Sequence, residues 1–141
     1  MTLRFGTDGV RGPAEELTDD LVTALGRAAA RVLEGDRFLI GRDTRESGPR
    51  IQDALAAGLA REGADVDLLG VVPTPAVAAL SASDGVPAAM ISASHNPYGD
   101  NGIKLFTAGG RKLPDSVEDR LEAELDQLVH DRSKAKGRTG E

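Results

Sequence analysis

A serine, a histidine, an amide and a lysine lie close together in ISASHNPYGDNGIKLF, residues 91–106 of the sequence. Ser94 follows an apolar run, and His95 and Asn96 come directly after it. Several turn-forming residues come next and predict a structured loop. Lys104 then opens a second apolar run, which predicts a strand that points the lysine back towards the loop. This one segment therefore offers a nucleophile, an imidazole, an amide and an ammonium group.

Ser94 has three interpretations: a capping or turn residue, a hydrolytic nucleophile, or a carrier of a phosphoryl group. Most serines form turns or caps, but the polar residues around Ser94 favour chemistry. The segment lacks the G-x-S-x-G pattern of a hydrolase, and His95 is too close in the sequence to act as its base, which leaves only His130. A phosphoserine instead needs cations and backbone N–H groups around it. The sequence therefore favours a phosphoryl carrier.

A glycine-rich segment near the start, FGTDGVRG at residues 5–12, is a candidate anion-binding loop. Its three glycines let the backbone turn tightly and present N–H groups to an anion. Arg11 adds a planar guanidinium group that suits phosphate oxygens. The alternative is an N-terminal turn with a solvated arginine, because glycine-rich loops are common.

A second candidate loop is GRDTRESG, residues 41–48, between a predicted buried strand and the start of a predicted helix. The N-terminus of a helix favours anions, and Arg42 and Arg45 add positive charge. The alternative is a surface cluster of ion pairs in which Asp43 and Glu46 neutralise the two arginines. Such clusters are common and contribute little to stability.

The elements that position these loops follow from the spacing of apolar residues. The pattern predicts helices over residues 19–33, 47–62, 74–82 and 114–129, and strands over residues 38–40, 66–72, 87–92 and 103–106. Strands that alternate with helices predict parallel pairing, with helices on both faces. The last strand follows the one before it too closely for a crossover helix, so we expect a three-layer α/β/α sandwich with a mixed, mainly parallel sheet. In such a sheet ligands gather beyond the carboxyl ends of the strands, where the three loops are expected to meet.

The composition limits the classes of protein to which the chain can belong. Its 141 residues suit one domain, and a formal net charge of −6 argues against a nucleic-acid or anionic-membrane partner. The sequence contains no cysteine, which excludes disulfides and thiolate metal sites. It shows neither a signal peptide nor an apolar run of the roughly 18 residues that a membrane span needs, so we expect a cytoplasmic protein. Residues 1–129 are expected to form the domain, and the polar residues 130–141 a linker or disordered tail.

Taken together and in order, the three motifs resemble those of the phosphohexomutase superfamily. The resemblance covers residues from about 3 to 128, and it implies that residues 1–129 are the first, phosphoserine-bearing domain of such an enzyme. The wording of the first and third motifs is similar to that of bacterial members that interconvert glucosamine 6-phosphate and glucosamine 1-phosphate. Members that act on phosphoglucose or phosphomannose are the alternative. A free-standing binding domain with the same fold and no catalysis is a third hypothesis.

The resemblance implies roles for particular residues. Ser94 is expected to be the phosphoserine that exchanges its phosphoryl group with the sugar phosphate, and one of its phosphate oxygens is expected to bind Mg²⁺. Lys104 is expected to be the general acid or base, and Arg11 to contact the transferring group. His95 and Asn96 are expected to orient the phosphoserine loop. The other candidates for binding phosphate or shaping the loops are Thr7, Asp8, Gly9, Arg42 and Asp43. A hexosamine 1,6-bisphosphate is the implied phosphorylating intermediate.

The resemblance extends only to the first of the four domains that such enzymes have. The magnesium-binding loop of the second domain, D-G-D-x-D-R, has no counterpart beyond Asp65-Val66-Asp67, and the sugar-recognition and phosphate-clamping loops are missing too. We therefore expect the chain alone to be inactive or nearly so, with the missing C-terminal domains as its partner. Because glucosamine-type members often pair through their first domain, the resemblance also points to a homodimer.

Overall fold

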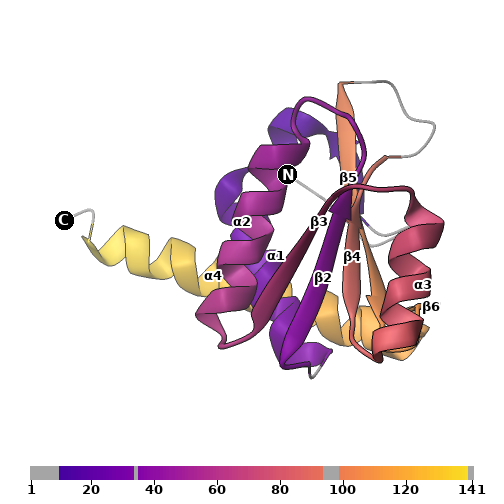
Figure 1. Ribbon diagram of the computed structural model, residues 1–141. Coiled ribbons are helices and arrows are strands. Elements are labelled where there is room, and N and C mark those ends of the chain that lie inside the picture. The colour runs from indigo at the N-terminus through magenta and orange to yellow at the C-terminus, as the bar shows by residue number, and fades with distance from the viewer. Residues whose placement is uncertain (1–9, 34, 94–98, 140–141) are drawn as a thin grey trace.

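Six strands form one mixed sheet in the computed structural model, which describes residues 10–33, 35–93 and 99–139, and for residues 130–139 only the course of the backbone. The strands are β1 (Val10–Pro13), β2 (Arg37–Arg42), β3 (Asp65–Val71), β4 (Ala88–Ile91), β5 (Asp100–Thr107) and β6 (Arg111–Lys112). Their order is β1-β5-β4-β2-β3, and β6 pairs with β5 (Figure 1).

Parallel pairing is confined to one half of this sheet. Strand β2 lies parallel to both β3 and β4, whereas β5 is antiparallel to β4, β1 and β6. The prediction of a mixed sheet is confirmed, but its parallel part is smaller than the sequence led us to expect. The reason is that β5 returns beside β4 without a crossover helix, and the short strands β1 and β6, which the sequence pattern missed, both pair with β5.

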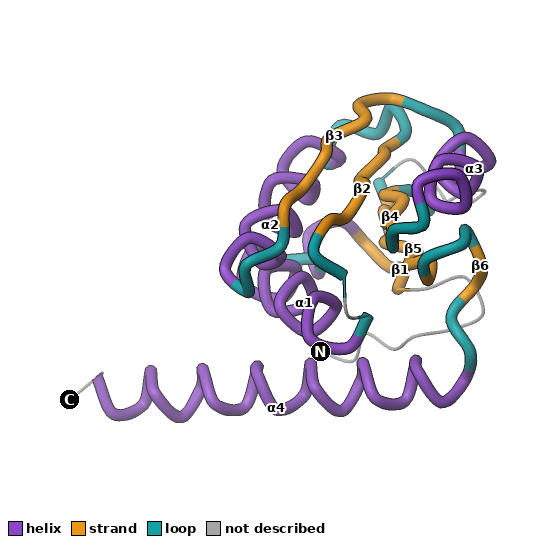
Figure 2. Tube along the Cα trace, turned by 60° about the horizontal axis from the view of Figure 1, so that its bottom comes forward, coloured by secondary structure: helices purple, strands orange, loops and turns teal. Residues whose placement is uncertain are grey.

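Helices cover both faces of the sheet, as predicted for a three-layer sandwich. The helices α1 (Asp19–Val32), α2 (Gly48–Arg61) and α4 (Asp115–Thr139) lie on one face, and α3 (Thr74–Asp84) lies on the other (Figure 2). A short 3₁₀ helix (Ala14–Glu16) links β1 to α1. No helix in the described part of the chain is long and apolar enough to cross a membrane.

The alternation of side chains along the strands divides the core into two layers. In β2, Phe38 and Ile40 pack against the helices α1 and α2, whereas Leu39 packs towards α3. In β4, Ile91 belongs to the first layer and Met90 to the second. This alternation also determines the face on which each polar side chain near the ends of the strands lies.

Capping explains where two of the helices begin or end. The Thr18 hydroxyl accepts a hydrogen bond from Leu21 N at 3.2 Å and so caps the start of α1. Gly85 ends α3 in the left-handed conformation, with φ of 68°. Ser47 holds the N-cap position of α2, but its hydroxyl forms no capping bond. It accepts a hydrogen bond from Asn101 instead.

Helices α1 and α2 cross at two glycines. A Cβ atom at Gly26 would lie 2.5 Å from Leu55 O, and one at Gly58 would lie 2.1 Å from Thr23 O. Only glycine therefore allows the two backbones to approach this closely. The close crossing fixes the position of α2 on the sheet and, with it, the loop that precedes α2.

Helix α4 is longer than the sequence pattern predicted. Its apolar stripe fades near residue 129, but the helix continues to Thr139 and extends beyond the rest of the domain (Figure 1). The extension contains no proline and several good helix formers, and such a composition favours continuation of the helix. The boundary of the domain at residue 129 stays a prediction.

Candidate active site

The second and third sequence motifs meet at one edge of the sheet. Strands β2 and β4 end side by side, with Arg42 opposite Ile91, and β5 begins at the same edge. Just beyond the ends of the strands, Asp43 N donates a hydrogen bond to Ile91 O at 3.1 Å. The predicted site residues Thr7, Asp8, Gly9, Ser94, His95 and Asn96 lie outside the described residues. The described part of the site is therefore the set of residues that surrounds both ends of the Ser94 segment.

Lys104 lies on the face of the sheet that α3 covers. It is opposite Met90 in the β4–β5 ladder, and its Nζ lies 5.5 Å from the centre of the Phe106 ring. Its side chain is partly buried, so the aromatic ring takes the place of some of the water around the ammonium group. Lys104 thus occupies a defined position near the end of β4, the strand that leads towards Ser94.

Arg11 lies on the same face of the sheet as Lys104. It is opposite Gly102 in the β1–β5 ladder, and a Cβ atom at Gly102 would lie 3.1 Å from Arg11 Cγ. Its neighbour Val10 points the other way, into the core beneath α1 and α2. The structure therefore brings Arg11 and Lys104, two cations that come from different sequence motifs, to one face beside the end of β4.

Arg42 lies on the opposite face of the sheet, at the start of α2. A Cβ atom at Gly48 would lie 3.4 Å from Arg42 Cδ, so the arginine packs over the first turn of this helix. Its Nε atom is buried, and the described residues give it no hydrogen-bond partner. Arg42 and Lys104 therefore lie on opposite faces of the sheet, because the side chains of a strand alternate between its two faces.

Arg45 forms one of the ion pairs that the alternative interpretation of this loop proposed, but its side chain is buried rather than on the surface. Its Nε donates to an Asp43 carboxylate oxygen at 3.0 Å, and its Nη1 donates to Asp100 O at 3.0 Å. Only 8% of the side chain is exposed. Arg45 therefore fastens the loop between β2 and α2 to the start of β5.

Asn101 is a buried polar residue whose role the sequence did not reveal. It has 0% exposure, its Nδ2 donates to Ser47 Oγ at 2.8 Å, and its Oδ1 accepts from Gly102 N at 2.8 Å. The sequence suggested only a turn-forming residue. Its position directly before the apolar part of a strand could have indicated this role, because a polar group that is buried there must form a hydrogen bond.

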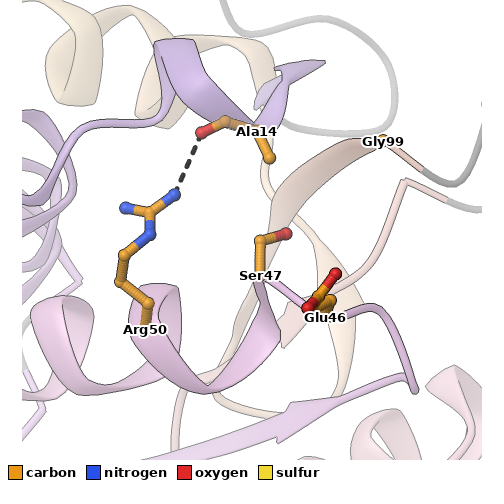
Figure 3. A pocket seen from close by; sticks show the side chains of 5 residues that line it. All are labelled: Ala14, Glu46, Ser47, Arg50 and Gly99. Atoms are coloured by element: carbon orange, nitrogen blue, oxygen red, sulfur yellow. Dashed lines mark hydrogen bonds between the residues drawn. The ribbon is translucent and has the colours of Figure 1, made fainter.

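A cleft of about 380 Å³ lies beside this arrangement. It is lined by Ala14, Glu46, Ser47, Arg50 and Gly99 (Figure 3). The Arg50 guanidinium donates to Ala14 O at 3.0 Å and to Leu17 O at 2.8 Å, so it holds the 3₁₀ helix against α2. Neither Lys104 nor Arg11 lines this cleft. Two of its polar lining residues, Ser47 and Arg50, are bonded to other parts of the fold.

The described residues do not provide a magnesium site. They contain no cluster of three or more histidine, aspartate or glutamate side chains that could hold a metal ion. Asp65 and Asp67, the nearest sequence match to a magnesium loop, are on β3, and Arg37 Nε donates to Asp67 Oδ2 at 2.6 Å. Arg37 and Asp65 face each other at the amino ends of β2 and β3, the edge of the sheet opposite the candidate site.

Comparison with known proteins adds evidence that is independent of this geometry. Residues 2–131 match the family described as phosphoglucomutase/phosphomannomutase, alpha/beta/alpha domain I. A relative from Corynebacterium aurimucosum named phosphoglucosamine mutase is 54% identical, covering 93% of this chain and 32% of that protein. A relative of the same name from Desulforudis audaxviator is 58% identical, covering 86% of this chain and 28% of that protein.

The fold comparison agrees with the sequence comparison. The crystal structure of a phosphoglucomutase/phosphomannomutase family protein from Burkholderia thailandensis superposes with a TM-score of 0.74 at 30% identity, covering 91% of this chain and 30% of that one. The chain thus spans about a third of the length of its relatives. Because the family match covers most of the 141 residues, the chain belongs to the phosphoglucomutase/phosphomannomutase family, as its α/β/α domain I.

Proposed function

We propose that this chain is the phosphoserine-bearing part of a phosphoglucosamine mutase, in which Ser94 carries a phosphoryl group between glucosamine 6-phosphate and glucosamine 1-phosphate. The observation that carries the proposal is the placement of Lys104 and Arg11 on one face of the sheet, beside the end of β4 that leads to Ser94. The names of relatives that are 54% and 58% identical support glucosamine as the sugar.

In the proposed reaction, a hydroxyl oxygen of the sugar phosphate attacks the phosphorus atom of phosphorylated Ser94. A bond forms between phosphorus and the sugar oxygen, and the bond between phosphorus and Ser94 Oγ breaks. The proton of the sugar hydroxyl passes to the Lys104 amine, and Ser94 Oγ takes up a proton from the solvent as it leaves. The resulting hexosamine 1,6-bisphosphate then transfers the phosphoryl group at its other end to Ser94.

The protein contributes alignment and charge stabilisation to a step of this kind. The Arg11 guanidinium is suited to the oxygens of the transferring group, because it presents several N–H donors in one plane. His95 and Asn96 are proposed to orient the phosphoserine loop. Thr7, Asp8 and Gly9 are proposed to complete the phosphate environment, whereas Arg42 and Asp43 shape the neighbouring loop.

The remaining parts of the site are proposed to come from outside this chain, since it spans 32% of the relative from Corynebacterium aurimucosum. Mg²⁺ is proposed for the complete enzyme, where it neutralises phosphate charge, and the described residues here supply no ligand set for it. The isolated chain is expected to be inactive or nearly so. A cytoplasmic location and pairing of two copies through this domain stay proposals.

A chimeric enzyme tests the proposal directly. The chain replaces the matching first third of the relative from Corynebacterium aurimucosum and is joined to the remaining domains of that protein. We expect the chimera to interconvert the two glucosamine phosphates, because this chain then supplies the phosphoserine to the remaining domains of a phosphoglucosamine mutase. Intact-mass measurement after incubation with a hexosamine 1,6-bisphosphate is expected to show one added phosphoryl group, and the variant Ser94→Ala is expected to show none.

Three other outcomes decide between the alternatives. Turnover only when the remaining domains come from a phosphoglucomutase or phosphomannomutase favours that alternative, which the broad family description also covers. A folded chimera with neither turnover nor a phosphate on Ser94 favours the non-catalytic binding domain. Turnover by the 141-residue chain alone, at a rate near that of the chimera, contradicts the expectation that the chain needs further domains.

A further inference from the structure

We infer that Ser47 and Asn101 are positioning residues for phosphoryl transfer, and that the hydrogen bond between them fixes the segment that carries Ser94. The inference rests on the proposed function of Ser94. It assigns to Ser47 and Asn101 a task that neither contact with substrate nor the capping of α2 explains. Four sets of contacts among the described residues support this role.

The bridge itself is buried and specific. Asn101 has 0% exposure, and its Nδ2 lies 2.8 Å from Ser47 Oγ. Its Oδ1 simultaneously accepts a hydrogen bond from Gly102 N at 2.8 Å. Both ends of the amide are therefore used, and the rotamer of Asn101 is fixed by two partners on different elements. A buried amide that loses such partners is costly, so the arrangement tolerates little displacement.

The next residue of β5 leaves equally little room. A Cβ atom at Gly102 would lie 2.7 Å from Val10 O and 2.9 Å from Ser92 O, closer than real Cβ atoms approach other atoms. Ser92 N also donates a hydrogen bond to Gly102 O at 2.9 Å. The backbone of β5 is thus held tightly between β1 and the residues that follow β4.

Both ends of the Ser94 segment are tied to the same short loop, residues 43–47. On the upstream side, Asp43 N donates to Ile91 O at 3.1 Å. On the downstream side, Arg45 Nη1 donates to Asp100 O at 3.0 Å, and Ser47 accepts from Asn101.

The downstream side has one more anchor, at the residue that directly follows the segment. Ala14 N donates a hydrogen bond to Gly99 O at 3.0 Å. Gly99, Asp100 and Asn101 are thus each bonded to a different group of the surrounding framework. The loop of residues 43–47, which the sequence suggested as a phosphate-binding loop, therefore holds the residues on both sides of the segment that bears Ser94.

These hydrogen bonds matter for the rate of transfer because phosphoryl transfer depends on the alignment of the reacting groups. A displacement of about 1 Å in a reacting group can cost roughly 100-fold in rate. Ser47 is anchored at the start of α2, and the close glycine crossing holds α2 against α1. The hydrogen bond between Ser47 and Asn101 thus ties the downstream side of the Ser94 segment to a rigid part of the fold. Removing it is expected to slow transfer without changing the groups that bind the sugar.

The test uses the chimeric enzyme and measures the transfer step itself. The variants are Ser47→Ala, Asn101→Ala and the double variant, each first loaded with phosphate on Ser94. Transfer to a sugar phosphate is followed in a single turnover by quenched intact-mass measurement. We expect each single variant to transfer roughly 10- to 100-fold more slowly, with KM changed less than about threefold. The double variant is expected to be no slower than the slower single variant, because the two residues act as a unit.

Ser81→Ala is the matched control. Ser81 is fully buried, as Asn101 is, and its hydroxyl donates to Val86 O at 2.6 Å and accepts from Gly110 N at 3.1 Å, beneath α3. This variant is expected to lower the melting temperature at least as much as Ser47→Ala does, while its transfer rate stays within about twofold of the parent. A loss of stability alone therefore cannot explain a slow Ser47→Ala variant.

Conservative variants complete the design. Ser47→Thr keeps a hydroxyl for the bridge, and Asn101→Asp keeps the acceptor for Gly102 N and can accept a hydrogen bond from Ser47. Both are expected to transfer faster than the alanine variants. If an alanine variant does not fold, Ser47→Cys takes its place, because a thiol is a weaker acceptor of similar size, and it is expected to transfer several-fold more slowly than Ser47→Thr.

Two results would overturn the inference, and they are distinguishable from each other. Bridge variants whose transfer rate stays within about twofold of the parent, while their melting temperatures fall as that of Ser81→Ala does, show that the bridge only stabilises the fold. A parent chimera that never carries or transfers a phosphoryl group removes the proposed function itself, and the inference falls with it.

Discussion

At the scale of single residues, Lys104 is the described residue whose proposed role is most open to a direct test. Its Nζ lies 5.5 Å from the centre of the Phe106 ring, on the face of the sheet that also carries Arg11. A cation at this position can act in two ways. It can stabilise phosphate charge, which needs only a positive group, or it can accept a proton, which needs a group that exists in a neutral form.

The variant Lys104→Arg separates these two roles. Arginine keeps the positive charge and can still stack on Phe106, but it does not give up its proton in proteins. We expect the chimeric enzyme with this change to lose about 100-fold or more in kcat, because general acid–base catalysis contributes a factor of that order. Steady-state kinetics on glucosamine 6-phosphate provides the measurement. A variant that retains a third or more of the parent's kcat would show that Lys104 acts through its charge alone.

Residue types and motifs predicted the candidate cations but not their arrangement. Arg11 and Arg42 each follow the pattern of a phosphate-binding arginine, yet they lie on opposite faces of the sheet. The face depends on whether a residue is at an odd or even position of a strand, and β1 was not predicted as a strand. The structural role of Asn101 was not predicted for a related reason. Its side chain is buried against the start of α2, which lies far away in the sequence.

At the scale of elements, the apolar periodicity predicted the long helices and the central strands within a few residues. The short strands β1 and β6 gave no signal, because four residues and two residues are too few to show alternation. The end of α4 was missed for the opposite reason. The apolar stripe marks where a helix packs, not where it ends, and a polar helix can continue on propensity alone.

The crossing of α1 and α2 gives a prediction at this scale. Alanine is normally favoured over glycine inside a helix by about 1 kcal/mol. At Gly58 the added Cβ would lie 2.1 Å from Thr23 O, a backbone atom that cannot rotate away. We therefore expect Gly58→Ala to destabilise the 141-residue chain by about 1–3 kcal/mol, as measured by urea unfolding. The exposed position next to it supplies the comparison, since Ala57→Gly is expected to cost only about 1 kcal/mol. A more stable Gly58→Ala protein would contradict the crossing geometry.

At the scale of the whole molecule, one network of charges joins the three helices on the same face of the sheet. Glu62, at the end of α2, accepts hydrogen bonds from Arg27 Nε at 2.8 Å and from Arg31 Nε at 3.0 Å, both on α1. Arg31 also donates to Glu124 on α4 at 2.7 Å. The carboxylate of Glu62 is only 19% exposed, so water screens these pairs less than it screens pairs on an open surface.

This network predicts how the stability of the domain depends on pH. Hydrogen bonds from Arg31 first, and from Arg27 second, lower the pKa of Glu62 from its usual value of 4.5, against a smaller opposing effect of burial. Because the unfolded chain then binds the proton more tightly than the folded one, the stabilisation is fully present above about pH 5 and is lost as the pH falls through the lowered pKa. We expect Glu62→Gln to be less stable than the parent at pH 7, and the difference in unfolding free energy to shrink steadily below about pH 4.5. Urea unfolding of the 141-residue chain at a series of pH values measures this difference, and Glu124→Gln, which leaves both hydrogen bonds to Glu62 in place, is the control with the smaller expected effect. A difference between Glu62→Gln and the parent that is constant from pH 7 to pH 3 would show that the network does not link protonation to the packing of the three helices.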